Sequence, residues 1–444
     1  MIAAPRAVPS ASLGSREVFA VAVPMTLGYL TTPLVGLAAT AVAGRLGDAA
    51  PIGGVALGSI LCDLVFTTFN FLRSGTTGLT AQAIGRGDGV EMRAVLARAL
   101  VFALVGGLLV VALLGPIRIL GLAFLGGSAP VAAAAATYVG IRLAAAPLTL
   151  AGFAVFGWFL GRGRAGIALA LQTLLNAANI ALALALGLGA GWGVAGIAAA
   201  GVGAEALALA VGLLFVTLDG RGTPWPARAR IFSAEAFRAM AAINRDIMIR
   251  SFVLLGAFAF FSRQSAAQGD LVLAANAILE KFFLLAGYFL DGLAAAAETF
   301  VGRAVGARDS AAFERAVRLT TRWAFVLAAL AAIALALLGP WAIGLMTPLP
   351  DVAEVARRHL PWAVATPLAG VLAFQMDGVF IGATWSRDMA RAMLVSFAIF
   401  VAAWASTFPF FGNDGLWAAF EVFLGVRGLT LWWAMRRRVA ATFA

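Results

Sequence analysis

The segment GDLVLAANAILEKFFLLAGYFLDGLAAAAETFVGRAVG, residues 269–306, decides the fold. Its centre is apolar enough to cross a bilayer as a helix, yet it carries Glu280, Asp291 and Glu298. At about 100° per residue the three carboxyl groups fall within roughly 20° of one stripe, with Asn276 about 40° from Glu280. An acid that faces lipid costs about 2.5–3.5 kcal/mol on insertion scales, so the stripe should face protein or a water-filled cavity. The three acids are therefore candidates for ion coupling, and an ordinary cavity-lining or loop-anchoring role is the alternative.

The composition of the whole chain agrees with a membrane protein. Of 444 residues, 62% are hydrophobic and 12% are charged, and the mean hydropathy is +0.96. Soluble domains do not have this balance, so the sequence predicts an all-α polytopic membrane protein.

The reactive residues are few. Cys62 and His359 are the single cysteine and the single histidine, so we expect no metal site, no cofactor and no Ser/His or Cys/His nucleophile. Gly85-Arg86-Gly87 lacks the pattern of a phosphate-binding loop. The sequence therefore predicts neither an enzyme nor a transporter driven by ATP.

Twelve apolar segments are long enough to span a bilayer. Pro24, Pro33, Pro147 and Pro367 fall inside them and predict bends. The predicted spans are 17–44, 52–85, 94–124, 129–161, 165–188, 193–217, 240–264, 269–306, 318–346, 353–384, 389–411 and 415–436.

The arginines in the loops predict the topology. The formal net charge of +11 comes mainly from arginines that gather in alternate loops and at both ends of the chain. The positive-inside rule then places both termini in the cytoplasm, and the even number of spans agrees. Because the charge is explained by topology, we expect membrane lipids and not nucleic acid as partners.

The two halves of the chain repeat. The motif Gly157-Trp158-Phe159-Leu160-Gly161 matches Gly378-Val379-Phe380-Ile381-Gly382, and Ala83-Ile84-Gly85 matches Ala304-Val305-Gly306, both at an offset of 221 residues. Six spans per half give both halves the same orientation, as in the parallel type of transporter repeat. The fold predicted is thus twelve transmembrane helices in two six-helix bundles related by a parallel pseudo-two-fold repeat. The predicted parts are a cytoplasmic tail 1–16, a bundle 17–218, a cytoplasmic linker 219–235, a bundle 236–436 and a tail 437–444.

Several motifs resemble the MATE family of multidrug and toxic compound extrusion transporters, nearest its DinF branch. The most specific is the run RSGTTGLTAQA at residues 73–83, and Asp377-Gly378-Val379-Phe380-Ile381-Gly382-Ala383 adds to it. The similarity extends from about residue 17 to residue 436. It implies secondary active export of amphipathic, often cationic compounds in exchange for H⁺ or Na⁺, by two bundles that open alternately to each side.

Two positions depart from the family pattern. Ala39 and Ala183 stand where related proteins carry the two acids assigned as the proton site of the N-terminal half. Coupling has then moved to Asp377 and the acids of 269–306, or it is weak or absent. The NorM branch places a cation site in the C-terminal half, which favours the first alternative.

Other charged residues at membrane depth complete the candidate site. Asp377 lies deep in its span with no adjacent base in the sequence, and coupling or helix capping would each explain it. Asp63 is a further ion-coupling candidate. Asp246 and Arg250 are spaced as a helical ion pair. Arg142 is a candidate contact for an anionic substrate group or a lipid headgroup.

A pocket for amphipathic compounds should be lined by adaptable apolar and aromatic side chains. The candidates for substrate binding, besides Arg142, are Asn276, Phe153, Phe156, Phe283, Tyr288, Phe374 and Met376. An ordinary core or lipid-facing role is the alternative for each.

The function predicted is ion-coupled export of small molecules from a bacterial plasma (inner) membrane by a protein that acts as a monomer. The alternative is a flippase for a lipid-linked or polyanionic substrate, which would require a strongly cationic central cavity.

Overall fold

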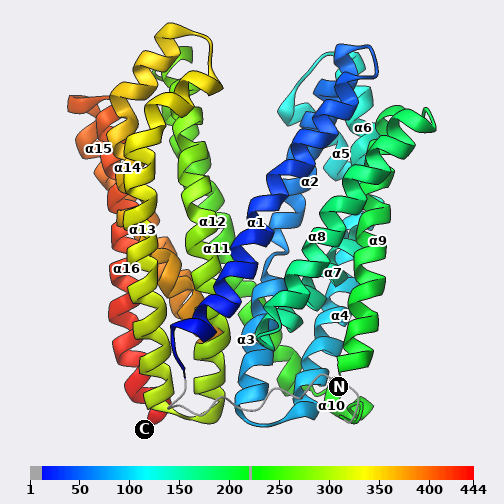
Figure 1. Ribbon diagram of the computed structural model, residues 1–444, viewed down its shortest axis with the longest axis vertical. Helices are drawn as coiled ribbons and strands as arrows, with labels where there is room; N and C mark the ends of the chain where they lie inside the picture. Colours follow the sequence, from blue (N-terminus) through cyan, green and yellow to red (C-terminus); the bar gives the residue numbers. More distant parts are fainter. Residues whose placement is uncertain (1–12, 220–222) are drawn as a thin grey trace. The chain divides into compact units, whose positions relative to one another are not determined.

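The computed structural model describes residues 13–219 and 223–444, and the described chain is helical with no strand (Figure 1). Parts of the predicted tail 1–16 and linker 219–235 lie outside these residues. The chain forms two compact units. Unit 1 is Leu27–Asn244, and unit 2 is Arg245–Ala444 together with the described start of α1, through Thr26.

The unit boundaries fall inside two helices, α1 and α11, and not in the segment 219–235. The start of α1 belongs to unit 2 because Gly292 of α12 lets the backbone of Ala22 approach closely, and because Trp323 donates a 2.9 Å hydrogen bond to Ser15. The start of α11 belongs to unit 1, where Asn244 lies over Gly75.

The helices of unit 1 follow the predicted spans, but three of those spans are interrupted. Breaks fall at Phe69–Asn70, at Leu113 and at Ala145, and the last bends the chain by 54° next to Pro147. The elements are α1 Ser15–Gly44, α2 Ala49–Thr68, α3 Phe71–Gly85, α4 Gly89–Ala112, α5 Leu114–Leu125, α6 Ala129–Ala144, α7 Ala146–Gly161, α8 Ala165–Leu182, the π-helical η2 Ala183–Gly189, α9 Gly193–Asp219 and α10 Arg228–Ile231.

The helices of unit 2 are longer and unbroken. The segment 269–306, which carries the three acids, forms the 38-residue helix α12, which begins at Asp270 and ends at Ala307. α14 continues through Pro361 and Pro367 as one helix. The elements are α11 Ala234–Ala266, α12 Asp270–Ala307, α13 Ser310–Met346, α14 Pro350–Ala383, α15 Ser386–Phe411 and α16 Asn413–Phe443.

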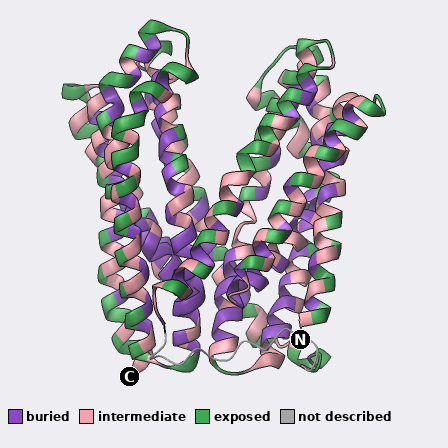
Figure 2. Ribbon diagram, viewed as in Figure 1, coloured by how far each residue is buried: buried purple, intermediate pink, exposed green. Residues whose placement is uncertain are grey.

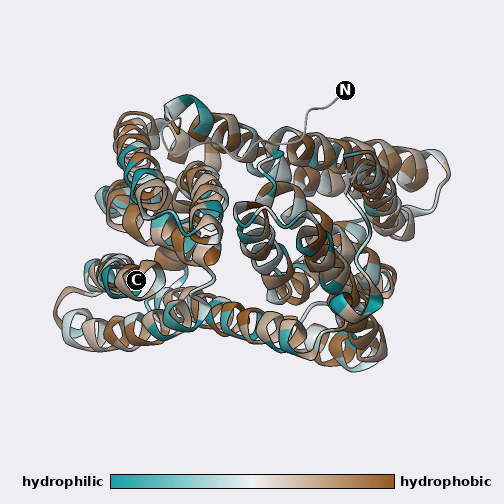
Figure 3. Ribbon diagram, turned by 90° about the horizontal axis from the view of Figure 1, so that it is seen from below, coloured by the Kyte–Doolittle hydropathy of each residue, from teal (hydrophilic) through white to brown (hydrophobic). Residues whose placement is uncertain are grey.

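The helices account for the twelve predicted spans. In the described chain, nine are long and apolar enough to cross a membrane, and the bent pair α6 and α7 raises the number to ten. The two remaining predicted spans, 240–264 and 415–436, lie in α11 and α16. These helices are as long as many of the others but carry more charged residues. Apolar residues are spread along the helices of both units (Figure 3).

In unit 2 the helix α14 is the central element. In its most apolar window 67% of the residues are buried, against 11% for α15 (Figure 2). The core of this unit is aromatic, and Phe283, Phe400 and Phe420 pack edge to face within it. A side chain carried by the inner face of α14 therefore lies in the protein interior.

The predicted repeat is confirmed in the local packing of each unit. A methyl group on Gly157 would lie 3.0 Å from the Cα of Arg73, and one on Gly378 would lie 2.9 Å from the Cα of Ala294. Both members of each pair are offset by 221 residues. The α3–α7 contact of unit 1 thus recurs as the α12–α14 contact of unit 2.

The loops that follow α3 and α12 repeat as well. Asp88 caps α4 by accepting a 2.8 Å hydrogen bond from the N–H of Glu91, and Asp309 caps α13 in the same way from Ala312. These caps satisfy amides that would otherwise lack a partner at a helix start.

Candidate functional site

Asp377 lies in the interior of unit 2 and contacts two arginines. Its Oδ2 accepts hydrogen bonds from Nη2 of Arg250 on α11 and Nη2 of Arg427 on α16. Arg427 is 3% exposed, and the carboxyl group of Asp377 is also buried. One carboxylate on α14 therefore joins three helices of this unit.

Two expectations about this region are wrong. Asp377 is not isolated from basic groups, because its partners come from helices distant in sequence. The helical pair between Asp246 and Arg250 does not form either. Asp246 instead accepts hydrogen bonds from Arg245, at 2.8 Å, and from the hydroxyl of Ser386, at 3.0 Å. The spacing of two residues along one helix identifies a possible pair. Here the partners from other helices, Asp377 for Arg250 and Ser386 for Asp246, form contacts instead.

The charge state of Asp377 is linked to helix packing. While the carboxylate is ionised, it stabilises two buried guanidinium groups that share one oxygen atom. Loss of that charge, by protonation or by binding of a cation, leaves two like charges close together in the interior. The packing of α11, α14 and α16 therefore depends on this one carboxylate.

The three acids of α12 differ in their surroundings. Glu298 is 4% exposed and lies beside the close contact with Gly382. Asp291 is half-buried, and Glu280 is half-buried with a hydrogen bond from Ser262. Lys281, about 100° away, is exposed. The stripe predicted from the sequence therefore points away from the exposed face of the helix.

Asn276 has all of its side-chain groups occupied by protein. Its amide nitrogen donates to Ser265 at 2.7 Å and to Asn413 at 2.8 Å. Its oxygen accepts from Asn413 and from Trp417. This network ties α12 to α11 and α16, which favours the structural reading of Asn276 over substrate contact.

The predicted aromatic candidates belong to different units. Phe153 and Phe156 are partly buried residues of α7 in unit 1. In unit 2, Met376 is fully buried and Phe283 is a core residue that contacts Phe374, with ring centroids 6.0 Å apart. Tyr288, half-buried on α12, completes the predicted set.

Unit 1 also holds an ion pair that is mostly buried. Nη2 of Arg142 on α6 contacts Glu205 of α9 at 2.9 Å, and Thr149 donates a 2.7 Å hydrogen bond to the other oxygen of Glu205. Asp63 lies on an exposed face of α2, close enough for the charge of Arg142 to act on it. The predicted contact of Arg142 with an anion is thus made by a residue of the protein.

The positions of the two missing acids are filled by an apolar cluster. Ala39 and Ala183, 8% and 1% exposed, pack with Val42, Val55 and Ile197. An ionised group in this cluster would be buried among side chains that cannot hydrogen-bond to it. The charged pairs held inside this unit lie elsewhere, at Arg142 with Glu205 and at Arg162 with Asp219.

Two acids at membrane depth were missed by the sequence argument, Glu205 and Glu421. Each is the lone acid in an apolar run, GVGAEALALA at 201–210 and GLWAAFEVFLG at 415–425. The rule that an ionisable residue within a span is a functional candidate would have found both. The search for a stripe of several acids on one helix passed over them.

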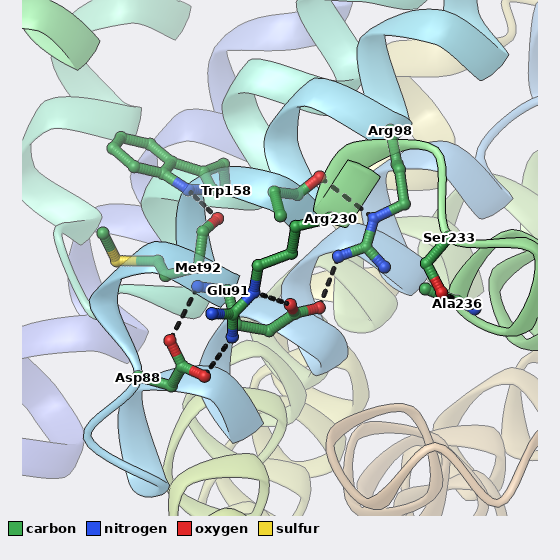
Figure 4. Close-up of polar contacts among 9 residues, drawn as sticks. Asp88, Glu91, Met92, Arg98, Trp158, Arg230, Ser233 and Ala236 are labelled. Atoms are coloured by element: carbon green, nitrogen blue, oxygen red, sulfur yellow. Dashed lines mark hydrogen bonds and ion pairs between the residues drawn. The ribbon is translucent and has the colours of Figure 1, made fainter. Parts of the chain in front are cut away.

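A peripheral cluster fixes the end of the connecting segment (Figure 4). Arg230 of α10 contacts both Asp88 and Glu91 at the start of α4, and Glu91 also contacts Arg98. Partial burial raises the pKa of Asp88, but the hydrogen bonds from the Glu91 N–H and from Arg230 outweigh it and hold the pKa below its usual value. By linkage, this ion pair stabilises unit 1 above the ordinary pKa of aspartate and is lost as the pH falls below it.

In the part of the chain that the structure describes, no group of three or more His, Cys, Asp and Glu side chains is placed to hold a metal ion. The carboxyl groups at membrane depth occur singly or opposite arginines. Long apolar helices in two units, with acids and arginines held inside them, define a polytopic membrane transporter.

Comparisons with known proteins identify the family. The MatE family model matches residues 24–185 and 247–405. The chain is 37% identical over 412 residues to DNA damage-inducible protein F of Escherichia coli (strain K12), covering 92% of this chain and 89% of that protein. It is 28% identical over 443 residues to the probable multidrug resistance protein NorM of Rhizobium meliloti (strain 1021), covering 93% and 94%.

Solved structures agree at the level of the fold. The crystal structure of the Vibrio cholerae MATE transporter VcmN in the bent form superposes with a TM-score of 0.88 at 19% identity, over 98% of each chain. The chain belongs to the MATE family and is a membrane transporter.

Proposed function

We propose that this protein exports amphipathic, cationic small molecules across a bacterial plasma membrane in exchange for inward movement of H⁺ or Na⁺, by alternating access. It acts as a monomer with both termini in the cytoplasm. The observation that carries the proposal is the contact of Asp377 with Arg250 and Arg427 inside unit 2.

Coupling requires a group whose occupancy changes the stability of one conformation relative to another. Asp377 is such a group because its charge stabilises two arginines on two other helices. When an ion neutralises Asp377, the packing of α11 and α16 against α14 becomes less favourable. Release of the ion restores the three-helix contact and completes the cycle.

The acids of α12 are proposed as further ion-coupling groups. Glu298, Asp291 and Glu280 lie on the helix that makes the closest contact with α14, so a change at Asp377 is transmitted directly to them. The apolar packing of Ala39 and Ala183 supports this placement of coupling in the C-terminal half. Asp63, exposed on α2, is the weaker candidate.

The alternative function, a flippase for a lipid-linked or polyanionic substrate, is favoured by one observation. The contacts of Arg250, Arg427 and Asp377 join two cations and one anion, and this positive formal charge is partly offset by Asp291 of α12, whose charge acts on Arg427. An anionic substrate group would compensate that charge. Arg142 gives no such support, because Glu205 already neutralises it.

The proposal is tested in everted membrane vesicles that carry a respiration-driven proton gradient. Ethidium is added, and dissipation of the gradient is followed for wild type, Asp377→Asn and Asp291→Asn. The control is Glu314→Gln, which removes an exposed carboxyl group on α13. The amount of folded protein is measured for each variant by size-exclusion chromatography in detergent.

We expect dissipation by wild type and by Glu314→Gln, and its loss in Asp377→Asn. Dissipation by Asp377→Asn at the wild-type rate would contradict the assignment of that carboxyl group. Transport of ethidium that responds to a Na⁺ gradient alone would select Na⁺ as the coupling ion. Transport of anionic lipid-linked compounds, with none of ethidium, would favour the flippase.

A further inference from the structure

Glu421 on α16 is a buried acid without a partner. Both of its carboxyl oxygen atoms are buried, and neither has a hydrogen-bond partner among the residues that the structure describes. The other acids on the inner side of unit 2 are surrounded differently. Asp377 contacts two arginines, and Glu280 accepts a hydrogen bond from Ser262.

The charged groups on the neighbouring helices have other partners or other positions. On α16 itself, Arg427 is six residues further on, about 9 Å along the axis, and it contacts Asp377. Asp414, two turns before Glu421, accepts a 2.8 Å hydrogen bond from Trp362 and lies 3.6 Å from His359. On α15, Asp388 contacts Arg438. The remaining charged residues of α12, α14, α15 and the unit 2 part of α11 are Arg245, Asp246, Arg250, Arg263, Asp270, Glu280, Lys281, Asp291, Glu298, Arg303, Asp351, Glu354, Arg357, Arg358, Arg387 and Arg391, and no contact joins any of them to Glu421.

An ionised Glu421 would therefore be a buried charge without compensation. Burial of a polar group without a hydrogen bond costs about 2–7 kcal/mol, and an unpaired charge costs more. The protonated carboxyl carries no charge and avoids most of this penalty. A sodium ion would need several oxygen ligands, and the nearest residues along the helix, Phe420, Val422 and Phe423, offer none from their side chains.

The helix hairpin around Glu421 contains a second polar side chain without a partner. The indole Nε1 of Trp404 on α15 is also buried and has no acceptor in the described chain. Thr407 donates a 2.8 Å hydrogen bond to the carbonyl of Gly415, which sets the antiparallel register of the hairpin. This register places Trp404 about one turn from the level of Glu421. An acceptor and a donor without partners thus lie within about one turn of each other along the axis of the hairpin.

The surface of α16 one turn beyond Glu421 is not covered by another helix. Gly425 is one turn further on and about 40° around the helix. A methyl group added to Gly425 would meet no atom within 4 Å. The backbone there is not in close contact with another helix, unlike Gly428, which packs against Ala373 and Leu372.

We propose that Glu421 is a proton-binding site of the C-terminal half, protonated in the conformation described here and deprotonated when the α15–α16 hairpin rearranges. This inference rests on the proposed export function and selects H⁺ as the coupling ion. The site is separate from the Asp377 cluster, and its proton moves between the carboxyl oxygen and water with no covalent change to the chain.

The test uses purified protein in proteoliposomes and two measurements of ethidium transport. The first is exchange of labelled for unlabelled ethidium without any ion gradient. The second is ethidium transport with an imposed pH gradient. The variants are Glu421→Gln, Glu421→Asp and the exposed control Glu314→Gln.

For Glu421→Gln we expect exchange to continue while the stimulation by the pH gradient disappears, so that the rates with and without the gradient become equal. Glu421→Asp should recover part of the stimulation, and Glu314→Gln should retain all of it. Stimulation of Glu421→Gln equal to that of wild type would overturn the role of Glu421. A wild type that shows exchange but no response to the pH gradient would instead overturn proton coupling as a whole.

A measurement on the wild-type protein keeps the inference testable if Glu421→Gln does not fold. Dicyclohexylcarbodiimide adds to a protonated carboxyl group in an apolar environment and gives a stable N-acylurea. Peptide mass spectrometry should find this adduct at Glu421, decreasing as the pH is raised. Labelling of other carboxyl groups with none at Glu421 at any pH would contradict a protonated, accessible Glu421.

Discussion

Single glycines determine how closely the helices of each unit approach. Gly378 and Gly382 of α14 bring this helix against the backbone of α12, so that the Cβ of any other residue would overlap it. Gly157 and Gly161 do the same for α7 and α3 in unit 1. The close contact places Asp377 and the acids of α12 on neighbouring surfaces. These glycines are therefore needed by the site as well as by the fold.

The role of Gly378 is tested by its replacement with alanine. The added methyl group would overlap the backbone at Ala294, and such overpacking costs about 1–3 kcal/mol. Gly256→Ala on α11 is the matched control, because a methyl group there meets nothing within 4 Å. We expect a lower melting temperature for Gly378→Ala and an unchanged or higher one for Gly256→Ala, measured in detergent. Equal melting temperatures would show that α12 and α14 are not in close contact.

At this scale the sequence predicted some features of the site and missed others. The apolar context of Asp377 and Glu298 was sufficient to predict that both are buried. The partners of Asp377 could not be predicted, because Arg250 and Arg427 are 127 and 50 residues away. The predicted ion pair between Asp246 and Arg250 was wrong because Arg250 contacts Asp377, which is distant in sequence. Glu205 and Glu421 carried a clear signal, a lone acid in an apolar run, that was not used.

Among the helices, α14 is the element on which unit 2 depends. Among the candidate spans of the described residues, its most apolar window has the largest buried share, 67%. Asp377 links it to α11 and α16. A helix held by one shared carboxylate is sensitive to the loss of that charge. The proposed coupling at Asp377 uses this sensitivity.

A double variant separates the ion cluster from simple packing. Asp377→Asn leaves two buried arginines without their anion, and removal of one partner of a buried ion pair costs about 3–5 kcal/mol. Asp377→Asn combined with Arg427→Gln removes one of the two uncompensated charges. We expect the single variant to have a much lower melting temperature and the double variant to recover part of the loss. If the change in melting temperature of the double variant equals the sum of the changes in Asp377→Asn and Arg427→Gln measured singly, the two residues do not interact.

At the scale of elements the sequence predicted most of the architecture. The offset of 221 residues identified motifs whose packing recurs in the structure, and the capping aspartates Asp88 and Asp309 extend the same repeat. Hydropathy located the spans but not the breaks at Phe69–Asn70 and Leu113, because continued apolar sequence hides an interruption. Pro147 marked the third break because it cannot donate to the helix that precedes it.

For the whole molecule, the two units have kept a common framework and differ in their buried charges. Unit 1 has an apolar cluster at Ala39 and Ala183 and neutralises Arg142 with Glu205. Unit 2 carries the arginine pair on Asp377, the acids of α12 and the unpartnered Glu421. This asymmetry is the reason for placing ion coupling in the C-terminal half.

Whether an ion gradient drives small-molecule export can be measured with purified wild-type protein in proteoliposomes. Ethidium transport is measured with an imposed pH gradient, with an imposed Na⁺ gradient and with neither. We expect transport against the ethidium gradient when a pH gradient is imposed. We expect no transport against the ethidium gradient when both ion gradients are absent. Transport that proceeds only down the ethidium gradient, whichever ion gradient is imposed, would contradict ion-coupled export.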